Sequence, residues 1–556
     1  MRCRTLVLLL CVGAVRCAAE GEWRTVRTAQ GPVRGLRDSS GEFYTFYNIP
    51  YATAPTGRER FKAPLPAPVW LQPLEAVNRG IICPQASMGF MMPDLKMQED
   101  CLVANVYVPD TEEKDLPVLV YVHGGAFQLG YGDWLKYTNL VKSKKVIIVN
   151  FNYRLGIHGF LCLGTKDAPG NAGMKDQVAL LRWVNRNIAS FGGNPKDVTI
   201  AGYSAGSASV DLLMLSKSAE GLFNKVIPES GSNLAAFSIQ SDPVENAKMH
   251  ARSLNFTEVD DIYALEEFYT RASYELLTLN PFFDRTDSTF VFSPCVERDT
   301  GDGVFLDDSP LNILKNGKYK KVPLLYGFAN MEGLLRIEFF DNWSHKMNEQ
   351  FSDFLPPDLI FENDAQREQV AQQVKEFYFG DKPVQEDNVL GYVDFFSDVM
   401  FTYSTLWAVK LHAEAGHDQV YLYEYSFVDE DTPVVPHTTT KGANHCSQTM
   451  AVADGNIFNI ITKLNDSSLS KEFNKMKGIV REIWLNFITT GQPMAERSSW
   501  PAAGAGRSPH MSLGRAVELR GVLREQRTRF WDDIYRRHYR QPAPPPVHPP
   551  RPRVDL

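Results

Sequence analysis

The chain of 556 residues is 44% hydrophobic and 22% charged, an ordinary globular composition with enough length for a large core. Its formal net charge of −8 does not attract phosphate backbones, so nucleic acid is not an expected partner. Because no long linker breaks the chain before its last residues, we expect one large domain over residues 20–540.

Residues 1–19 have the features of a secretory signal. Arg2 and Arg4 precede an apolar run from Leu6 to Val15 that is too short to span a bilayer. No other run reaches 18 apolar residues. We therefore expect a secreted protein without a membrane span. The chain ends in Val-Asp-Leu, a loose match to an endoplasmic-reticulum retention signal, so retention there is the alternative.

Eight cysteines are present, and three of them lie in the signal. The other five are Cys83, Cys101, Cys162, Cys295 and Cys446. Because five is odd, at least one thiol stays free. None of the five has metal-ligand spacing, so no metal site is predicted. Cys83 and Cys101 enclose a short loop, and in a secreted chain we expect them to pair, with two buried free thiols as the alternative.

Three sequons for N-glycosylation also fit a secreted chain. They are Asn255, Asn342 and Asn465. Each is predicted to be glycosylated, with a chance match as the alternative.

The first half of the chain alternates strand and helix patterns. Short β-like runs between Trp23 and Phe46 predict a small N-terminal sheet. Buried strands are predicted at Val118–Val122 and Val146–Phe151, and apolar residues at helical spacing predict a helix within Gly173–Phe191. This order of strand, helix and strand favours a mostly parallel sheet with helices on both faces.

The strand at Val118–Val122 runs directly into His123-Gly124-Gly125-Ala126. A Gly pair after a buried strand lets backbone N–H groups turn toward a ligand, as an oxyanion-hole loop does. A simple Gly turn is the alternative.

A second motif lies between the predicted strand Val198–Ala201 and the predicted helix Ala205–Leu215. It is Gly202-Tyr203-Ser204-Ala205-Gly206, a GxSxG sequence. A strand, a sharp turn and a helix form a nucleophile elbow, which raises the Ser204 hydroxyl above the sheet and aims helix N–H groups at the same point. The glycines are needed because a side chain at either position would meet the adjacent strand or helix. GxSxG alone is common by chance, so its strand and helix carry the prediction.

Several longer stretches resemble one family. The stretches EDCLVANVY, YVHGGAF, NYRLGIHGF, PGNAGMKDQVALLRWVNRNIASFGGNPKDVTIAGYSAGSAS and IPESGS are similar to the carboxylesterase/cholinesterase family of α/β-hydrolases, in particular to secreted insect carboxylesterases. The similarity runs from about Trp23 to about Tyr535. It implies the α/β-hydrolase fold and an ester hydrolase without a cofactor.

The resemblance identifies two further site residues. Glu332 follows a predicted strand at Val322–Phe328 and matches the family's acid, whereas an isolated Glu-Gly pair is usually a solvated turn. His445 follows a predicted strand at Val420–Phe427 and matches the family's histidine in a G-x-x-H sequence, whereas most isolated histidines are structural. Ser204, Glu332 and His445 stand in the order that α/β-hydrolases use.

The resemblance also implies the oxyanion hole, which consists of the backbone N–H groups of Gly125, Ala126 and Ala205. Gly125 and Ala126 are the second and third residues of the Gly run, which face the substrate in the family. Ala205 directly follows the nucleophile.

The chain departs from the family at three places. Tyr203 stands before the nucleophile, where the family often has Glu. Cys446-Ser447-Gln448 follows the histidine, where an acidic residue is usual, and Cys446 is predicted to be a small buried residue. Only Cys295 lies within residues 240–320, so we expect the family's second disulfide loop to be absent.

The expected substrate is an apolar small-molecule ester. The loop between Cys83 and Cys101 lacks the Trp that binds quaternary ammonium in cholinesterases, so choline esters are not expected. Juvenile hormone esterases typically have Gln at the position of Tyr203, so that role is not expected either. Met and Phe in the loop indicate an apolar pocket mouth for odorant, dietary or xenobiotic esters. The alternative is a non-catalytic or stoichiometric binding relative of the same fold.

The C-terminal part has two predicted amphipathic helices, at Lys471–Thr490 and Leu523–Tyr539. Residues 541–556 are Pro-rich and are predicted to be a disordered tail.

Overall fold

The computed structural model describes residues 22–86, 95–279, 284–454, 469–496 and 499–548. The predicted signal and Asn465 lie outside the described residues. Within the described part of the chain, no helix combines the length and apolar character needed to cross a membrane.

A sheet of 13 described strands runs through the molecule. These strands are β1 (Trp23–Arg27), β2 (Pro32–Arg37), β3 (Phe43–Pro50), β4 (Leu74–Glu75), β7 (Val103–Pro109), β8 (Leu116–Val122), β9 (Ile147–Phe151), β10 (Gly193–Tyr203), β11 (Lys225–Glu229), β12 (Leu324–Ala329), β13 (Val420–Tyr425), β14 (His510–Leu513) and β15 (Val517–Arg520). Their order is β1-β2-β3-β7-β9-β8-β10-β11-β12-β13-β14-β15, with β4 beside β2, and the strands from β9 to β14 are parallel. Two short strands, β5 (Ile81–Ile82) and β6 (Lys96–Met97), pair separately.

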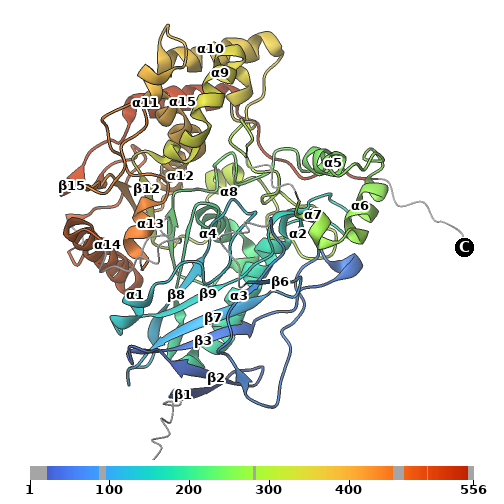
Figure 1. Cartoon of the computed structure of the whole chain (residues 1–556), viewed down its shortest axis with the longest axis vertical. Coiled ribbons are helices and arrows are strands. Elements are labelled where there is room, and N and C mark those ends of the chain that lie inside the picture. The colour runs from blue at the N-terminus through green and yellow to red at the C-terminus, as the bar shows by residue number, and fades with distance from the viewer. Residues whose placement is uncertain (1–21, 87–94, 280–283, 455–468, 497–498, 549–556) are drawn as a thin grey trace, which may run out of the picture.

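Helices cover the sheet and also gather at one end of the molecule. They are α1 (Thr138–Lys142), α2 (Gly156–Phe160), α3 (Ala172–Asn187), α4 (Ala205–Leu215), α5 (Pro243–Ser253), α6 (Ile262–Arg271), α7 (Tyr274–Leu277), α8 (Pro310–Asn316), α9 (Phe340–Glu349), α10 (Asp364–Phe379), α11 (Val389–Ser397), α12 (Tyr403–Glu414), α13 (Ser447–Val452), α14 (Lys471–Thr490) and α15 (Glu525–His538). Helices α9 to α11 and α15 gather at the end of the molecule opposite β1 and β2 (Figure 1).

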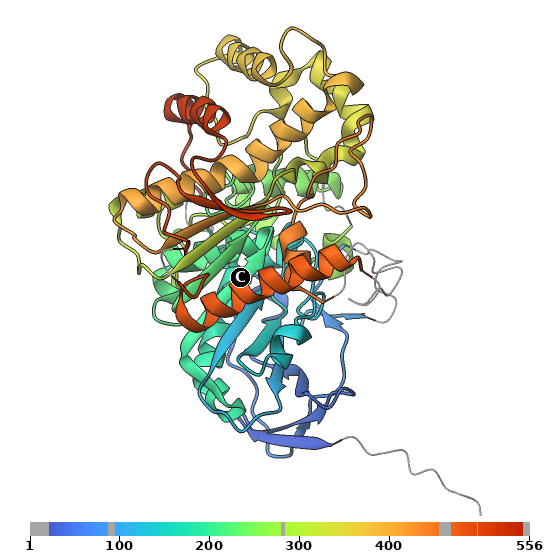
Figure 2. The same cartoon turned by 90° about the vertical axis from the view of Figure 1, so that its left-hand side faces the viewer.

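Both faces of the central sheet are buried. In β8, Val118 and Val120 belong to one core cluster, which includes side chains of α3 and α4. Leu119 and Tyr121 point to the other face and belong to a second cluster, which includes the apolar face of α14. Figure 2 shows α14 lying across that face. Because alternate residues of a strand face opposite sides, a fully apolar strand such as β8 requires this two-sided cover.

The sequence predicts where helices and strands begin and end better than it predicts which strands pair with each other. The helices at Ala205–Leu215 and Lys471–Thr490 have the predicted bounds, whereas the strand before the elbow begins earlier, at Gly193. The N-terminal strands do not form a sheet of their own, because β3 pairs antiparallel with β7 and continues the main sheet. Strand pairing of this kind is set by distant residues and is not visible in local periodicity.

The structure contains two disulfides within its described residues. The expected bond joins Cys83 to Cys101. A second bond joins Cys162 to Cys295, a pair that the sequence analysis did not predict, since it considered only a bridge within residues 240–320. The partner is 133 residues away, so no local loop signals it. The remaining thiol, Cys446, is free and buried, as expected.

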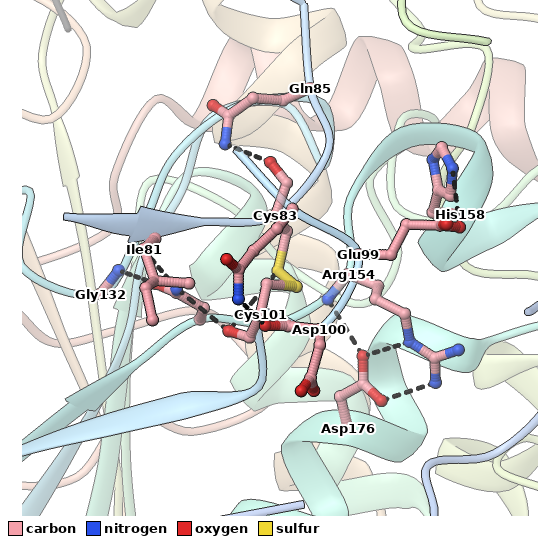
Figure 3. The surroundings of a disulfide bond; sticks show 12 residues. Ile81, Cys83, Gln85, Glu99, Asp100, Cys101, Gly132, Arg154, His158 and Asp176 are labelled. Carbon is pink, nitrogen blue, oxygen red and sulfur yellow. Dashed lines mark hydrogen bonds and ion pairs between the residues drawn. A yellow bond between two sulfur atoms is a disulfide. The ribbon is translucent and has the colours of Figure 1, made fainter. Parts of the chain in front are cut away.

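Two ion pairs hold the chain beside the first disulfide. Arg154 binds Asp176 through two hydrogen bonds, Nε to Oδ2 (2.8 Å) and Nη2 to Oδ1 (2.6 Å). Arg60 binds Glu99, which precedes the loop's closing cysteine by two residues, at 2.9 Å. Figure 3 shows the Arg154–Asp176 pair next to Cys101, with Glu99 facing His158. Because Nη1 of Arg154 also donates to the carbonyl of Arg60 (2.9 Å), the two ion pairs link Glu99 to α3.

Part of the predicted disordered tail lies within the described residues. Residues 541–548 lie along the body of the molecule, and Nε of Arg298 donates a hydrogen bond to the carbonyl of Pro545 (2.8 Å). An extended Pro-rich segment makes no internal hydrogen bonds, so donors from the body can hold it in place. Residues 549–556 lie outside the described part of the chain.

Candidate active site

Ser204 lies at the turn between β10 and α4. It has φ 55° and ψ −123°, and α4 begins with the next residue. A residue with a side chain rarely adopts these angles, and such strain persists only where the surroundings impose it. The Ser204 N–H donates to the carbonyl of Glu229 in the neighbouring strand β11 (2.9 Å), which holds the turn against the sheet.

Gly202 and Gly206 are required by close contacts, which confirms the prediction made for the motif. A Cβ on Gly206 would lie 2.2 Å from the carbonyl oxygen of Val122. A Cβ on Gly202 would lie 2.4 Å from the carbonyl oxygen of Gly206. Any side chain at either position would therefore push α4 away from the sheet and displace Ser204.

The Gly loop after β8 lies directly against Ser204. A Cβ on Gly124 would lie 2.5 Å from the carbonyl oxygen of Tyr203 and 3.1 Å from Cβ of Ser204. The next three residues, Gly125, Ala126 and Phe127, all have positive φ, at 106°, 59° and 59°. Successive left-handed residues reorient the backbone, so the loop turns sharply beside Ser204.

His123 fixes this loop from behind. Its Nδ1 lies 2.8 Å from the carbonyl of Gly124, its ring stacks on Tyr153 at 4.4 Å, and the Tyr153 hydroxyl donates to its carbonyl. Burial lowers the pKa of His123 to about 4, so the ring is neutral. Since a carbonyl only accepts, Nδ1 carries the hydrogen and donates it.

Glu332 is fully buried at the start of a 3-10 helix, η4 (Glu332–Phe339), after β12. Its Oε1 accepts hydrogen bonds from the Ala329 N–H (2.7 Å) and the Ser230 hydroxyl (2.5 Å). Its Oε2 lies 2.5 Å from Nδ1 of His445. The structure therefore brings the predicted acid and the predicted base together.

The loops that carry these two residues bind each other. The Met331 N–H donates to the carbonyl of Ala443 (3.1 Å), and the Ala443 N–H donates to Oδ1 of Asn330 (2.9 Å). A Cβ on Gly442 would lie 2.1 Å from Sδ of Met331. Gly442 therefore allows the close approach that sets the imidazole opposite the carboxylate.

Ser230 and Gln448 are site residues to which the sequence analysis gave no role. Gln448 Nε2 donates to Ser230 Oγ (2.5 Å), which in turn donates to Glu332. Gln448 belongs to the short stretch after His445 in which the family usually has an acid, and this chain has a neutral amide there. Ser230 lies within the quoted IPESGS stretch, and this was the one available signal. Burial and the nearby Glu332 raise the pKa of Cys446, whose thiol also contacts Ser230 and the backbone of Ser204.

Tyr203 is packed beneath the Gly loop. It is 7% exposed, its ring stacks on Tyr121 at 6.2 Å, and a Cβ on Gly124 would lie 2.9 Å from its ring. Burial raises the pKa of Tyr203, so the phenol is neutral. The residue before Ser204 thus supports the loop and carries no charge.

A cavity of about 780 Å³ lies beside the loop of His445. Gly442, Ala443, Asn444 and Ser447 line it on that side. Most other lining side chains are apolar, and they include Leu334, Ile337, Tyr425, Phe427, Val435 and Phe473. Asp429 and Asp431 also line this cavity, whereas Ser204 and His445 do not, so the cavity adjoins the loop of His445 without enclosing the predicted catalytic side chains.

With this geometry in place, comparison with known families matches residues 22–531 to the carboxylesterase family. The chain belongs to the carboxylesterase family. It is similar to a carboxylic ester hydrolase of Bombus ignitus, with 33% identity covering 95% of this chain and 98% of the relative. It is also similar to a juvenile hormone esterase of Heliothis virescens, with 32% identity covering 85% of this chain and 87% of the relative.

A solved structure supports the same fold. The crystal structure of juvenile hormone esterase from Manduca sexta with OTFP covalently attached has a TM-score of 0.82 and 30% identity to this chain. The likeness covers 93% of this chain and all of that structure. Family membership and these relatives make the protein a carboxylic-ester hydrolase with the α/β-hydrolase fold.

Proposed function

We propose that the protein hydrolyses small apolar esters. In this proposal Ser204 is the nucleophile, His445 is the general base, and Glu332 is the carboxylate that orients His445. The hydrogen bond between Nδ1 of His445 and Oε2 of Glu332 carries this proposal. The position of Ser204 at a strained turn against the Gly loop supports it.

The proposed reaction has two steps. In the first, Ser204 Oγ attacks the ester carbonyl carbon while Nε2 of His445 takes its proton, and the imidazolium returns that proton to the leaving alcohol. In the second, water attacks the acyl-enzyme with the same base, releasing the acid and restoring Ser204. Glu332 holds the Nδ1–H tautomer and balances the positive charge of the ring.

The oxyanion formed in each step needs hydrogen-bond donors. The backbone N–H groups of Gly125, Ala126 and Ala205 are proposed for this role. The first N–H groups of a helix have no partner within the helix, which favours Ala205. Gly125 and Ala126 are proposed because both have positive φ, which turns the backbone sharply beside Ser204.

Tyr203, a buried neutral phenol, stands where juvenile hormone esterases typically have Gln, and on this basis we propose a general ester range instead of juvenile hormone. Assays should therefore include a juvenile hormone-like methyl ester beside acetyl, butyryl and hexanoyl esters of bulky alcohols.

Secretion is part of the proposal. The two disulfides are typical of oxidising compartments. Asn255 and Asn342 are both exposed, as glycosylation requires.

The test compares Ser204→Ala with the wild type on a nitrophenyl ester. The variant should lose turnover almost completely. Ser209→Ala, at a buried serine of α4, should keep the wild-type turnover. Wild-type turnover by Ser204→Ala would refute the mechanism. A burst of one product per chain without turnover in the wild type would indicate a stoichiometric ester binder.

A further inference from the structure

The aromatic ring of Phe401 lies against the imidazole of His445. Their ring centroids are 4.2 Å apart, and their planes are inclined by 28°. Phe401 is 1% exposed and His445 is 7% exposed, so the contact is almost free of solvent. Phe401 also packs on Phe237, at 5.5 Å between centroids, and Phe237 is fully buried. The ring facing His445 is therefore held on more than one side.

The segment that carries Phe401 has an unusual backbone. Residues Asp398–Thr402 form one turn of π-helix (η7, here the π-turn) between α11 and α12, and all five residues are buried. A π-turn inserts an extra residue into a helix and often occurs at functional sites, because it redirects side chains that a regular helix would place elsewhere.

The π-turn is anchored to the C-terminal helix. Asp398 accepts hydrogen bonds from Nε of Arg527 (2.6 Å), from Nη2 of Arg527 (2.6 Å) and from the hydroxyl of Tyr378 (2.5 Å). Arg527 belongs to α15. The bidentate pair fixes the start of the turn, three residues before Phe401.

The same segment also binds the loop of the acid. The Gly333 N–H, which directly follows Glu332, donates to Oγ of Ser397 (2.8 Å). A Cβ on Gly333 would lie 2.1 Å from the carbonyl oxygen of Val393. Ser397 and Phe401 therefore touch the acid's loop and the base from one short stretch of helix.

We propose that Phe401 is a positioning residue that fixes the plane of the His445 ring and stabilises its protonated form during ester hydrolysis. This inference rests on the proposed triad. The face of an aromatic ring is negative, and a cation over it is attracted most strongly where water is excluded. Because positive charge develops on the ring as His445 takes the proton of Ser204, the aromatic face stabilises the transition state more than the state before proton transfer.

The other titratable groups around His445 lie on different elements. Glu332 faces it from η4. Cys446 follows it in its own loop, and both Glu332 and Glu229 of β11 raise the pKa of the Cys446 thiol. Asp398, the acidic residue of the π-turn, is paired with Arg527. The segment of Phe401 thus presents an aromatic face, and no unpaired charge, to the base.

The experiment replaces Phe401 by Leu, which keeps apolar volume and removes the ring. We expect kcat and kcat/KM to fall together by about 3- to 30-fold, with little change in KM. The acid limb of the kcat/KM–pH profile should move to lower pH by about 0.5 to 1 unit, because the imidazolium is then less stable. Phe401→Tyr keeps the aromatic face and should restore most of the rate and the position of the limb.

Phe395→Leu is the matched control. Phe395 is fully buried in α11 and packs on Tyr378 and Phe396. Its loss should lower the thermal midpoint without moving the pH profile. If Phe401→Leu does not fold, Phe401→Met supplies an adaptable apolar side chain for the same measurement.

A folded Phe401→Leu or Phe401→Met enzyme with the wild-type kcat and a superimposable pH profile would overturn the inference. That result leaves the proposed triad intact as long as Ser204→Ala is inactive. If Ser204→Ala is active, the proposed function itself fails, so the two failures are distinguishable.

Discussion

Nδ1 of His445 and Oε2 of Glu332 lie 2.5 Å apart, although 113 residues separate them along the chain. Glu332 is fully buried, and its other oxygen is occupied by the Ala329 N–H and the Ser230 hydroxyl. The carboxylate therefore has one free direction of approach, and the imidazole takes it.

Replacing Glu332 by Gln tests the role of this contact. The amide keeps the shape of the side chain but cannot balance an imidazolium, so kcat should fall on the order of 10⁴-fold with little change in KM. Glu297→Gln, at another buried carboxylate, should change stability and leave kcat unaltered. A kcat for Glu332→Gln within tenfold of the wild type would contradict the assignment of the acid.

Gly124→Ala tests the contact between the Gly loop and the nucleophile. The added Cβ would lie 2.5 Å from the carbonyl oxygen of Tyr203, which is closer than real contacts allow. The loop must shift, and losing one oxyanion donor costs about 10²- to 10³-fold in kcat. Gly478→Ala in α14, where a Cβ meets nothing within 4 Å, is the control and should be as active as the wild type. Equal kcat values for the two variants would argue against an oxyanion role for this loop.

The dependence of stability on pH should reflect Asp211. This carboxyl is buried in α4, accepts hydrogen bonds from Tyr326 (2.6 Å) and from the Asn233 N–H (2.7 Å), and burial raises its pKa to about 7. The folded state then binds more protons than the unfolded state between about pH 4 and pH 7, so stability is highest below this window and falls as pH rises through it.

Asp211→Asn removes this contribution. The free energy of unfolding, measured in urea at pH 5, 6 and 7, should fall less steeply with pH in the variant, by up to about 1.4 kcal/mol per pH unit. Asp381→Asn, at an exposed position, should show the wild-type slope. Identical slopes for wild type and Asp211→Asn would show that the carboxyl is not protonated in the folded state.

The local parts of the site could be predicted from sequence, and its long-range parts could not. The elbow was predictable because a strand, a turn and a helix are encoded within the stretch from Val198 to Leu215. Glu332 and His445, the proposed acid and base, were found only through the family resemblance, because nothing local marks a Glu-Gly pair or a lone histidine. The stacking of Phe401 on His445 depends on packing between distant segments, which periodicity does not encode. The same holds for the hydrogen bonds from Gln448 to Ser230 and from Ser230 to Glu332.

The second disulfide was missed for the same reason. Cys162 follows α2, while Cys295 lies in a long connection and is held by the side chain of Asn171, which bonds both its N–H and its carbonyl. Its partner therefore becomes visible only when the connection is placed on the body of the molecule.

Removing this disulfide should cost more than removing the first. A closed loop of 133 residues contributes about 5 kcal/mol in the chain-entropy model, against about 3 kcal/mol for the loop of 18. The double variant Cys162→Ala, Cys295→Ala should lose more stability in urea than Cys83→Ala, Cys101→Ala. In the chain without residues 1–19, a thiol assay should find one group, Cys446, and only after unfolding. Three reactive thiols would contradict the second bond.

The most direct test of the central claim is the mass of the protein after reaction with a fluorophosphonate ester. The account predicts one covalent adduct per chain, located on the peptide that contains Ser204, with ester hydrolysis lost in proportion to labelling and no adduct on Ser204→Ala. An unlabelled protein that still hydrolyses esters, or an adduct on another residue with activity lost in parallel, would contradict it.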